Sequence, residues 1–305
     1  MESMTRRFPL ILAMLATLGS ARPALAVAPS YVGSFTSPSL CSPRGVALSP
    51  SGDVFVSSDC HLLGHVEHFT AAGGLVGSWK FPTAFQGPPN GIAVDGSGNV
   101  FVTDTDGNSV WKFTSSGVLM TTFPNTFLAP VDVDVDGSGN VYEVEFVGNV
   151  VRKLTNGGSL VQTLGRSGTL PGQFQDPNGI GLDASGRVYV TDYTRQRVLR
   201  FLPDGTFDME FTSPLDPFDV AVGPDGNIYV IGNDGRGIYQ YSQGGVLLTG
   251  FTVPTGFLDA AKLAIDPTGM ILVTEELFNR VTMFQIDMST ATLHMTLGRL
   301  KAIYR

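Results

Sequence analysis

The sequence predicts an all-β fold, a six-bladed β-propeller in which each blade is a sheet of four antiparallel strands. Three observations predict it. One sequence unit recurs six times at a spacing of 40 to 47 residues, marked by the turn glycines Gly52, Gly98, Gly139, Gly186, Gly226 and Gly269; this spacing is typical of propellers and other repeat arrays. Each unit contains short strand-like segments separated by turn residues. The composition, with 37 Gly, 19 Pro and only 15% charged residues, also favours many short strands joined by turns.

The first half of each unit is a predicted hairpin. An apolar strand, a turn that contains glycine and a second strand follow one another in all six copies. The copies are residues 42–59, 88–104, 129–145, 176–192, 216–232 and 259–275.

A third and a fourth strand complete each unit, as in "VLRF" followed by "FDMEF". Six units of four strands close into a ring that leaves no long exposed edge. Two segments compete for the outer strand of the sixth blade, "YVGSF" at 31–35 and "LHMTLG" at 293–298. We predict that Tyr31 to Phe35 completes this blade beside the C-terminal strands, because pairing the two ends of the chain closes the ring.

These repeats resemble the NHL family. "SPRGVALSPSGDVFV" and "DPNGIGLDASGRVYVTDYTRQRVLRF" fit its motif best: proline, an apolar strand, Asp, a Gly-bearing turn, a strand, Asp, Arg-Val and Phe. Proteins with this architecture include amidating and antibiotic lyases, lactone hydrolases, receptor sensor domains and binding modules, so the resemblance implies a scaffold and leaves the function open. It also implies structural ion pairs of Asp192 with Arg197 and of Glu275 with Arg280.

Residues 1–26 have the features of a secretory signal: Arg6 and Arg7, an apolar run, and "ALA" at 24–26 as a cleavage site. We therefore expect residues 27–305 to form the propeller, in the periplasm or outside the cell, with twin-arginine export as the minor alternative. No later stretch is long enough to span a bilayer. Removing the signal changes the formal net charge from −8 to −10, which argues against nucleic acid as a partner because phosphate contacts need a positive surface.

The stretch "VDVDVDGSGNVYEVEF" at 131–146 contains five acids and fits the calcium-loop pattern D-x-D-x-D-G followed by Glu. Comparison of the repeats accounts for three of them: Asp136 is a turn residue, Asp132 has a counterpart in Asp219, and Glu145 stands where other copies also have an acid. Asp134 and Glu143 remain, since the other copies have small or apolar residues there.

Three hypotheses explain Asp134 and Glu143. They pair with Arg152, Lys153 or an arginine of a neighbouring blade; or a calcium ion is held by Asp132, Asp134, Asp136 and Asn140; or they form a functional acid pair reached from the central channel. We favour pairing, because buried charges are usually paired and an extended strand spreads alternate side chains about 6–7 Å apart instead of wrapping an ion.

Cys41 and Cys60 are the two cysteines of the chain, and they flank the first hairpin. Facing positions across a hairpin suit a disulfide, which we predict and which would stabilise the fold by roughly 3 kcal/mol. His61, His65 and His68 follow directly. His65 and His68 straddle an expected strand and so point to opposite faces, which favours a solvated loop over a zinc site.

The loops that enter the first strand and leave the second should meet on one face, around the mouth of the channel. The expected ligand-face residues are Arg44, Asn90, Val131, Asn178, Phe218 and Ala261, with Asp104, Asp192, Tyr193 and Asn233 further out. Asp132 and Asp219 could approach each other across the channel. Asn90 and Asn178, in "PNGIAV" and "PNGIGL", are similar to metal-holding asparagines of gluconolactonase-like propellers.

No Ser-His-Asp set, nucleophile elbow or phosphate loop is present, and we assign no catalytic or metal-binding residue. The sequence thus predicts an exported, monomeric binding or interaction module for a protein, peptide or small molecule. We expect no cofactor, with calcium as the candidate ion. The alternative is a metal-dependent hydrolase or lyase, similar to gluconolactonases or amidating lyases, acting at the channel mouth.

Overall fold

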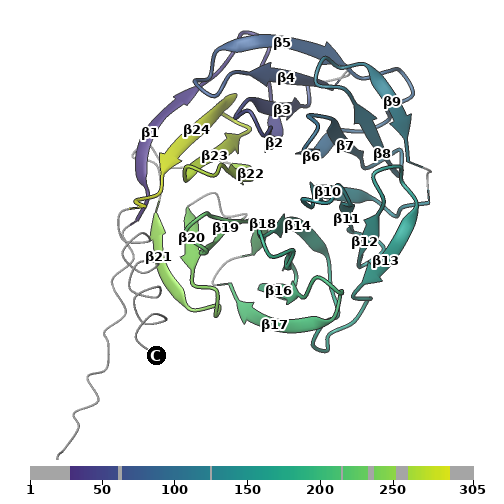
Figure 1. The fold of residues 1–305 in the computed structure, drawn as a ribbon, viewed down its shortest axis with the longest axis vertical. Helices are drawn as coiled ribbons and strands as arrows, with labels where there is room; N and C mark the ends of the chain where they lie inside the picture. Colours follow the sequence, from purple (N-terminus) through teal and green to yellow (C-terminus); the bar gives the residue numbers. More distant parts are fainter. Residues whose placement is uncertain are drawn as a thin grey trace, which may run out of the picture.

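The computed structural model describes residues 28–60, 64–123, 126–213, 216–232, 237–251 and 260–288. These residues form 24 strands in six four-stranded antiparallel sheets, and no helix. The sheets surround a central channel as the blades of a propeller (Figure 1). The predicted six-bladed propeller is therefore confirmed. The predicted signal at residues 1–26 lies outside the described residues, among which no helix could cross a membrane.

Each blade runs from the channel outward in sequence order, except the last. Blade 1 is β2 (Pro43–Leu48), β3 (Val54–Ser58), β4 (His65–Phe69) and β5 (Leu75–Lys80). Blade 2 is β6 (Pro89–Val94), β7 (Val100–Asp104), β8 (Ser109–Phe113) and β9 (Leu119–Thr122). Blade 3 is β10 (Pro130–Val135), β11 (Val141–Glu145), β12 (Val150–Leu154) and β13 (Leu160–Leu164).

The other three blades follow the same order. Blade 4 is β14 (Pro177–Leu182), β15 (Val188–Asp192), β16 (Arg197–Phe201) and β17 (Phe207–Thr212). Blade 5 is β18 (Pro217–Val222), β19 (Ile228–Gly232), β20 (Ile238–Tyr241) and β21 (Leu247–Phe251). Blade 6 is β22 (Ala260–Ile265), β23 (Met270–Glu275), β24 (Arg280–Gln285) and β1 (Ser30–Phe35).

The N-terminal strand closes the ring. β1 pairs antiparallel with β24, from Ser30 opposite Gln285 to Phe35 opposite Val281. Figure 1 shows the first and last strands side by side in blade 6. The predicted closure by residues 31–35 is confirmed, and the competing segment 293–298 lies outside the described residues.

The core lies between blades, because the second strand of each blade is packed on both faces. In β11, Val141 packs toward blade 2 while Tyr142 and Val144 pack toward blade 4. Alternate side chains of a strand point to opposite faces, so such a strand must be apolar at nearly every position. Glu143 breaks this rule.

Cys41 and Cys60 form the predicted disulfide, with their Cα atoms 5.4 Å apart. His65 and His68 lie in β4 and not in a solvated loop. They do point to opposite faces: His65 is buried with Nε2 3.1 Å from Glu67 Oε1, while His68 stacks on Phe55. His61 lies outside the described residues.

Candidate ligand site at the channel mouth

The innermost strands bring one repeat position of all six blades to the channel. The residues at this position, the third of each strand, are Gly45, Gly91, Asp132, Gly179, Asp219 and Lys262. Glycine is required where neighbouring strands touch: a Cβ on Gly91 would lie 2.6 Å from Cα of Asp132, and one on Gly179 would lie 2.6 Å from Cα of Asp219.

In four of the six blades, hydroxyl groups form hydrogen bonds that link the blade to the next one. In blade 4, Thr191 Oγ1 accepts a hydrogen bond from Gly179 N (2.7 Å) and donates one to Phe218 O of blade 5 (3.3 Å). Ser57 and Thr274 make the same pair of bonds from blades 1 and 6. In blade 2 the two bonds are divided between Thr103 and Thr105.

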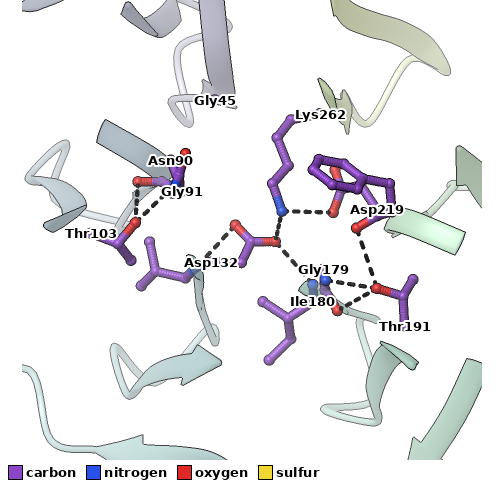
Figure 2. Close-up of polar contacts among 12 residues, drawn as sticks. Gly45, Asn90, Gly91, Thr103, Asp132, Gly179, Ile180, Thr191, Asp219 and Lys262 are labelled. Atoms are coloured by element: carbon purple, nitrogen blue, oxygen red, sulfur yellow. Dashed lines mark hydrogen bonds and ion pairs between the residues drawn. The ribbon is translucent and has the colours of Figure 1, made fainter. Parts of the chain in front are cut away.

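Blades 3 and 5 have Val144 and Ile231 in place of this hydroxyl, and an aspartate makes the connection instead. Asp132 Oδ2 accepts from Ile180 N of blade 4 (3.0 Å), and Asp219 Oδ2 accepts from Leu263 N of blade 6 (2.8 Å). Figure 2 shows both kinds of link, in which Thr191 and Asp132 each form a hydrogen bond with a strand of the next blade. The two aspartates that the repeats place in register therefore share a structural role.

Lys262 of blade 6 joins the two aspartates in a buried cluster, the channel triad (Asp132, Asp219 and Lys262). Its Nζ lies 2.8 Å from Asp132 Oδ2 and 3.6 Å from Asp219 Oδ1, as Figure 2 shows. Burial raises the pKa of Asp219 to about 8, although Lys262 acts against this shift. Burial alone would lower the pKa of Lys262, but Asp132 and Asp219 outweigh it and raise that pKa. Within the triad, burial thus favours the protonated form of Asp219, and the two aspartates favour the charged form of Lys262.

Among the described residues, Asp134 is satisfied by backbone donors and not by a cation. Its oxygens accept from Val135 N (2.7 Å) and from Leu182 N of blade 4 (2.9 Å). Burial, which outweighs these bonds, raises its pKa to about 7. The hypothesis of an arginine or lysine partner is thus wrong for Asp134, which acts as a further link between blades 3 and 4.

The other acids of this stretch have separate surroundings. Asp136 accepts the N–H groups of Ser138 and Asn140 in the hairpin turn, so it does not face the channel with Asp132 and Asp134. Among the described residues no group of three or more His, Cys, Asp or Glu side chains is arranged to hold a metal ion.

Glu143 is completely buried between blades 2 and 3. It stands opposite Arg152 in the strand register, but Arg152 Nε lies 2.6 Å from Oε1 of Glu145. Burial and the neighbouring Glu145 raise the pKa of Glu143 well above its ordinary value, although Arg152 opposes this shift. This shift favours the protonated form of Glu143, and Glu143 does not line the channel cavity that Asp134 lines.

The six predicted mouth residues line one pocket, the mouth pocket, of about 140 Å³. Its lining residues are Arg44, Asn90, Val131, Asn178, Phe218, Ala261, Lys262 and Glu276. Tyr193 does not line it. Asp132 and Asp219 line a second cavity of about 220 Å³ further down the channel, and Lys262 lines both cavities. Lys262 thus lies between the mouth pocket and the cavity that Asp132 and Asp219 line.

The outer acids of the predicted face are structural, and Asn233 lies outside the described residues. Asp104 accepts from Gln86 N and Gly107 N. The two predicted acid–arginine pairs are confirmed: Asp192 lies 2.9 Å from Arg197, and Glu275 lies 2.9 Å from Arg280.

Sequence reasoning missed Lys262 and Glu276. A signal for Lys262 was present, because it occupies the repeat position that other blades fill with glycine or aspartate. The sequence signal for Glu276 was weaker, because this residue follows an acid that most repeats also have.

The family comparison matches the repeat. The model described as "NHL repeat" matches residues 89–113 and 174–201, which are the hairpin and third strand of blades 2 and 4. The chain is a six-bladed β-propeller with NHL repeats in blades 2 and 4. No curated protein matches this NHL-repeat propeller.

Solved structures share the fold of this NHL-repeat propeller at low sequence identity. A gluconolactonase-family structure is 16% identical with a TM-score of 0.66, covering 88% of this chain and 97% of the other. A catalytically inactive virginiamycin B lyase from Staphylococcus aureus, solved with quinupristin, is 18% identical with a TM-score of 0.63, covering 84% and 88%. A streptogramin B lyase is 14% identical with a TM-score of 0.60, covering 85% and 98%. At these identities the likeness establishes the fold alone.

Proposed function

We propose that this NHL-repeat propeller is an exported binding protein that holds a small ligand, or a small group of a larger one, in the mouth pocket. The observation that carries the proposal is the convergence of side chains from all six blades on that pocket. Ligand sites in ring-shaped folds gather where loops or strand ends meet around an axis.

The chemistry of the pocket favours a small polar ligand. The side-chain amide of Asn90 already accepts a hydrogen bond from Arg44 and donates one to Thr105. The amide of Asn178 has no hydrogen bond to any described residue, so it offers one donor group and one acceptor. The partly exposed ring of Phe218 adds an apolar surface. The volume of about 140 Å³ lies below the roughly 300 to 1,000 Å³ of sites that hold drug-sized ligands.

Binding can be tested with a panel of small polar compounds, such as sugars, hydroxy acids, amides and amino acids, by thermal shift and calorimetry. We expect a hit whose affinity falls at least about tenfold in Asn178→Ala and in Phe218→Ala. Tyr193→Ala, a rim aromatic outside the pocket, should leave the affinity unchanged. A ligand that binds all three variants as it binds the parent would place the site elsewhere.

Export is part of the proposal. The disulfide between Cys41 and Cys60 supports it, because such crosslinks persist in oxidising compartments. Mass spectrometry of the protein from its native host should find the N-terminus at or near Val27, and a retained Met1 would contradict export through a cleaved signal.

A second candidate function is hydrolysis or elimination at the same pocket. The raised pKa of Asp219, in the adjoining channel cavity, favours it, because strongly perturbed carboxyl groups occur at catalytic sites. A screen of lactones and α-hydroxyglycine peptides, with added calcium, zinc or manganese, tests it. Turnover that disappears in Asp219→Asn would support an enzyme; the absence of turnover across the screen would support binding alone.

A further inference from the structure

Arg44 is held more loosely than the other arginines in ion pairs. Its guanidinium lies 3.3 Å from Glu276 Oε1, 3.3 Å from Asn90 Oδ1 and 3.6 Å from Asp59 Oδ2. Its Nε is buried without a hydrogen-bond partner among the described residues. Five other arginines each have an ion pair of 2.6 to 2.9 Å; they are Arg152, Arg187, Arg197, Arg200 and Arg280. Arg44 is therefore oriented toward the pocket with donors still unsaturated.

The charged residues that line the pocket carry both signs. Lys262 is engaged at 2.8 Å by Asp132 below the pocket, so its charge is compensated there. Arg44 and Glu276 are the remaining charged lining residues, and their side chains stay partly exposed, at 31% and 20%. An anion bound at Arg44 would meet the carboxylates of Glu276 and Asp59, and a cation bound at Glu276 would meet the guanidinium.

We propose that the mouth pocket takes the zwitterionic group of a free α-amino acid with a small side chain. This inference rests on the proposed binding function and names its ligand class. The ligand carboxylate binds Arg44, whose planar fork matches carboxylate geometry, and the ligand ammonium binds Glu276. The ligand then brings one charge of each sign, so its binding leaves the net charge of the pocket unchanged.

The uncharged lining fits the rest of such a ligand. Asn178 supplies an amide oxygen for the ammonium or an N–H for the carboxylate. Phe218, Val131 and Ala261 surround the side chain with apolar surface. The volume of about 140 Å³ favours a small side chain, because drug-sized ligands occupy sites of roughly 300 to 1,000 Å³.

The inference can be tested by calorimetry on the purified chain with four probes: L-alanine, propionate, ethylamine and L-tryptophan. We expect L-alanine to bind and each of the others to bind at least about tenfold more weakly, since each lacks one charge-assisted bond or exceeds the pocket. Arg44→Gln and Glu276→Gln should each weaken L-alanine at least about tenfold. Arg187→Gln is the matched control, because it removes an arginine of a different pair, with Asp183, and should leave binding unchanged.

The outcomes separate this inference from the proposed function. If propionate binds with the same affinity as L-alanine, the proposal of a zwitterionic ligand is wrong. It is also wrong if Glu276→Gln binds L-alanine as tightly as the parent does. Failure of all four probes also overturns it, and the proposed function then still stands if a neutral compound of the wider panel binds in a Phe218-dependent way. If no compound of that panel binds, the binding function itself fails.

Discussion

Asp134 should make the protein less stable at pH 8 than at pH 5.5. Its pKa in the folded protein is about 7, against an ordinary value of 3.8. Between these values the folded state holds a proton that the unfolded state has lost. Stability therefore falls as pH rises from about 4 to about 7 and changes little above that, because both states are then ionised.

The size of this loss of stability follows from the pH range between the unfolded and folded pKa values of Asp134. Each pH unit in which one extra proton is bound corresponds to about 1.4 kcal/mol. From pH 5.5 to the folded pKa of about 7 the loss is thus at most about 2 kcal/mol. Asp134 is partly exposed to the channel, and water there reduces the desolvation penalty, so we expect about 1 kcal/mol.

This loss of stability can be measured by urea unfolding of the parent and of Asp134→Asn at pH 5.5 and at pH 8. The asparagine oxygen can still accept from Leu182 N, but it does not titrate, so the variant should lose about 1 kcal/mol less than the parent between pH 5.5 and pH 8. Asp136→Asn is the control two residues away. Hydrogen bonds to Asn140 and Ser138 lower the pKa of Asp136 despite its burial, so its contribution is constant in this range. Equal pH dependence of Asp134→Asn and the parent would show that Asp134 is ionised throughout, and would refute the reasoning.

Three further predictions concern stability. Lys262→Met should destabilise the fold by about 3–5 kcal/mol, because it leaves buried acids without their cation; adding Asp132→Asn should restore part of this in urea unfolding, and no restoration would argue against the ion pair as the cause. Reducing the disulfide between Cys41 and Cys60 should cost roughly 3 kcal/mol, seen as a lower thermal midpoint with reductant; two free thiols in unreduced, alkylated protein would contradict the bond. Deleting residues 27–36 should lower the thermal midpoint through loss of β1, and an unchanged midpoint would show that this strand does not support the closure.

The blades themselves could be predicted from the sequence, because the residues that determine each hairpin lie close together in the chain. Hairpin registers are set by turns such as the one at Gly98, whose φ of 82° favours glycine, and by apolar residues within a few positions of it. The number of repeats then fixed the number of blades. The disulfide followed for the same reason, since its cysteines flank a single hairpin.

The mouth pocket could be predicted in outline, because equivalent positions of a repeat must meet around the axis. Its charge pattern could not. Lys262 and Asp132 are far apart in the sequence, and their contact at 2.8 Å exists only because the ring brings blade 6 opposite blade 3. Tyr193 has the chemistry of a ligand residue, yet the turn that carries it ends outside the pocket.

Only the tertiary structure decided what the acids of residues 131–146 do. The sequence showed that Asp134 and Glu143 depart from the repeat, and elementary electrostatics required a partner or a proton for each. The partner of Asp134 is Leu182 N at 2.9 Å, a backbone group that every residue except proline carries and that no side-chain pattern marks. Arg152 lies 2.6 Å from Glu145, and burial raises the pKa of Glu143, which favours its protonated form. Repeat periodicity determines which positions face one another, whereas the choice among competing polar partners depends on distances that only the closed ring sets.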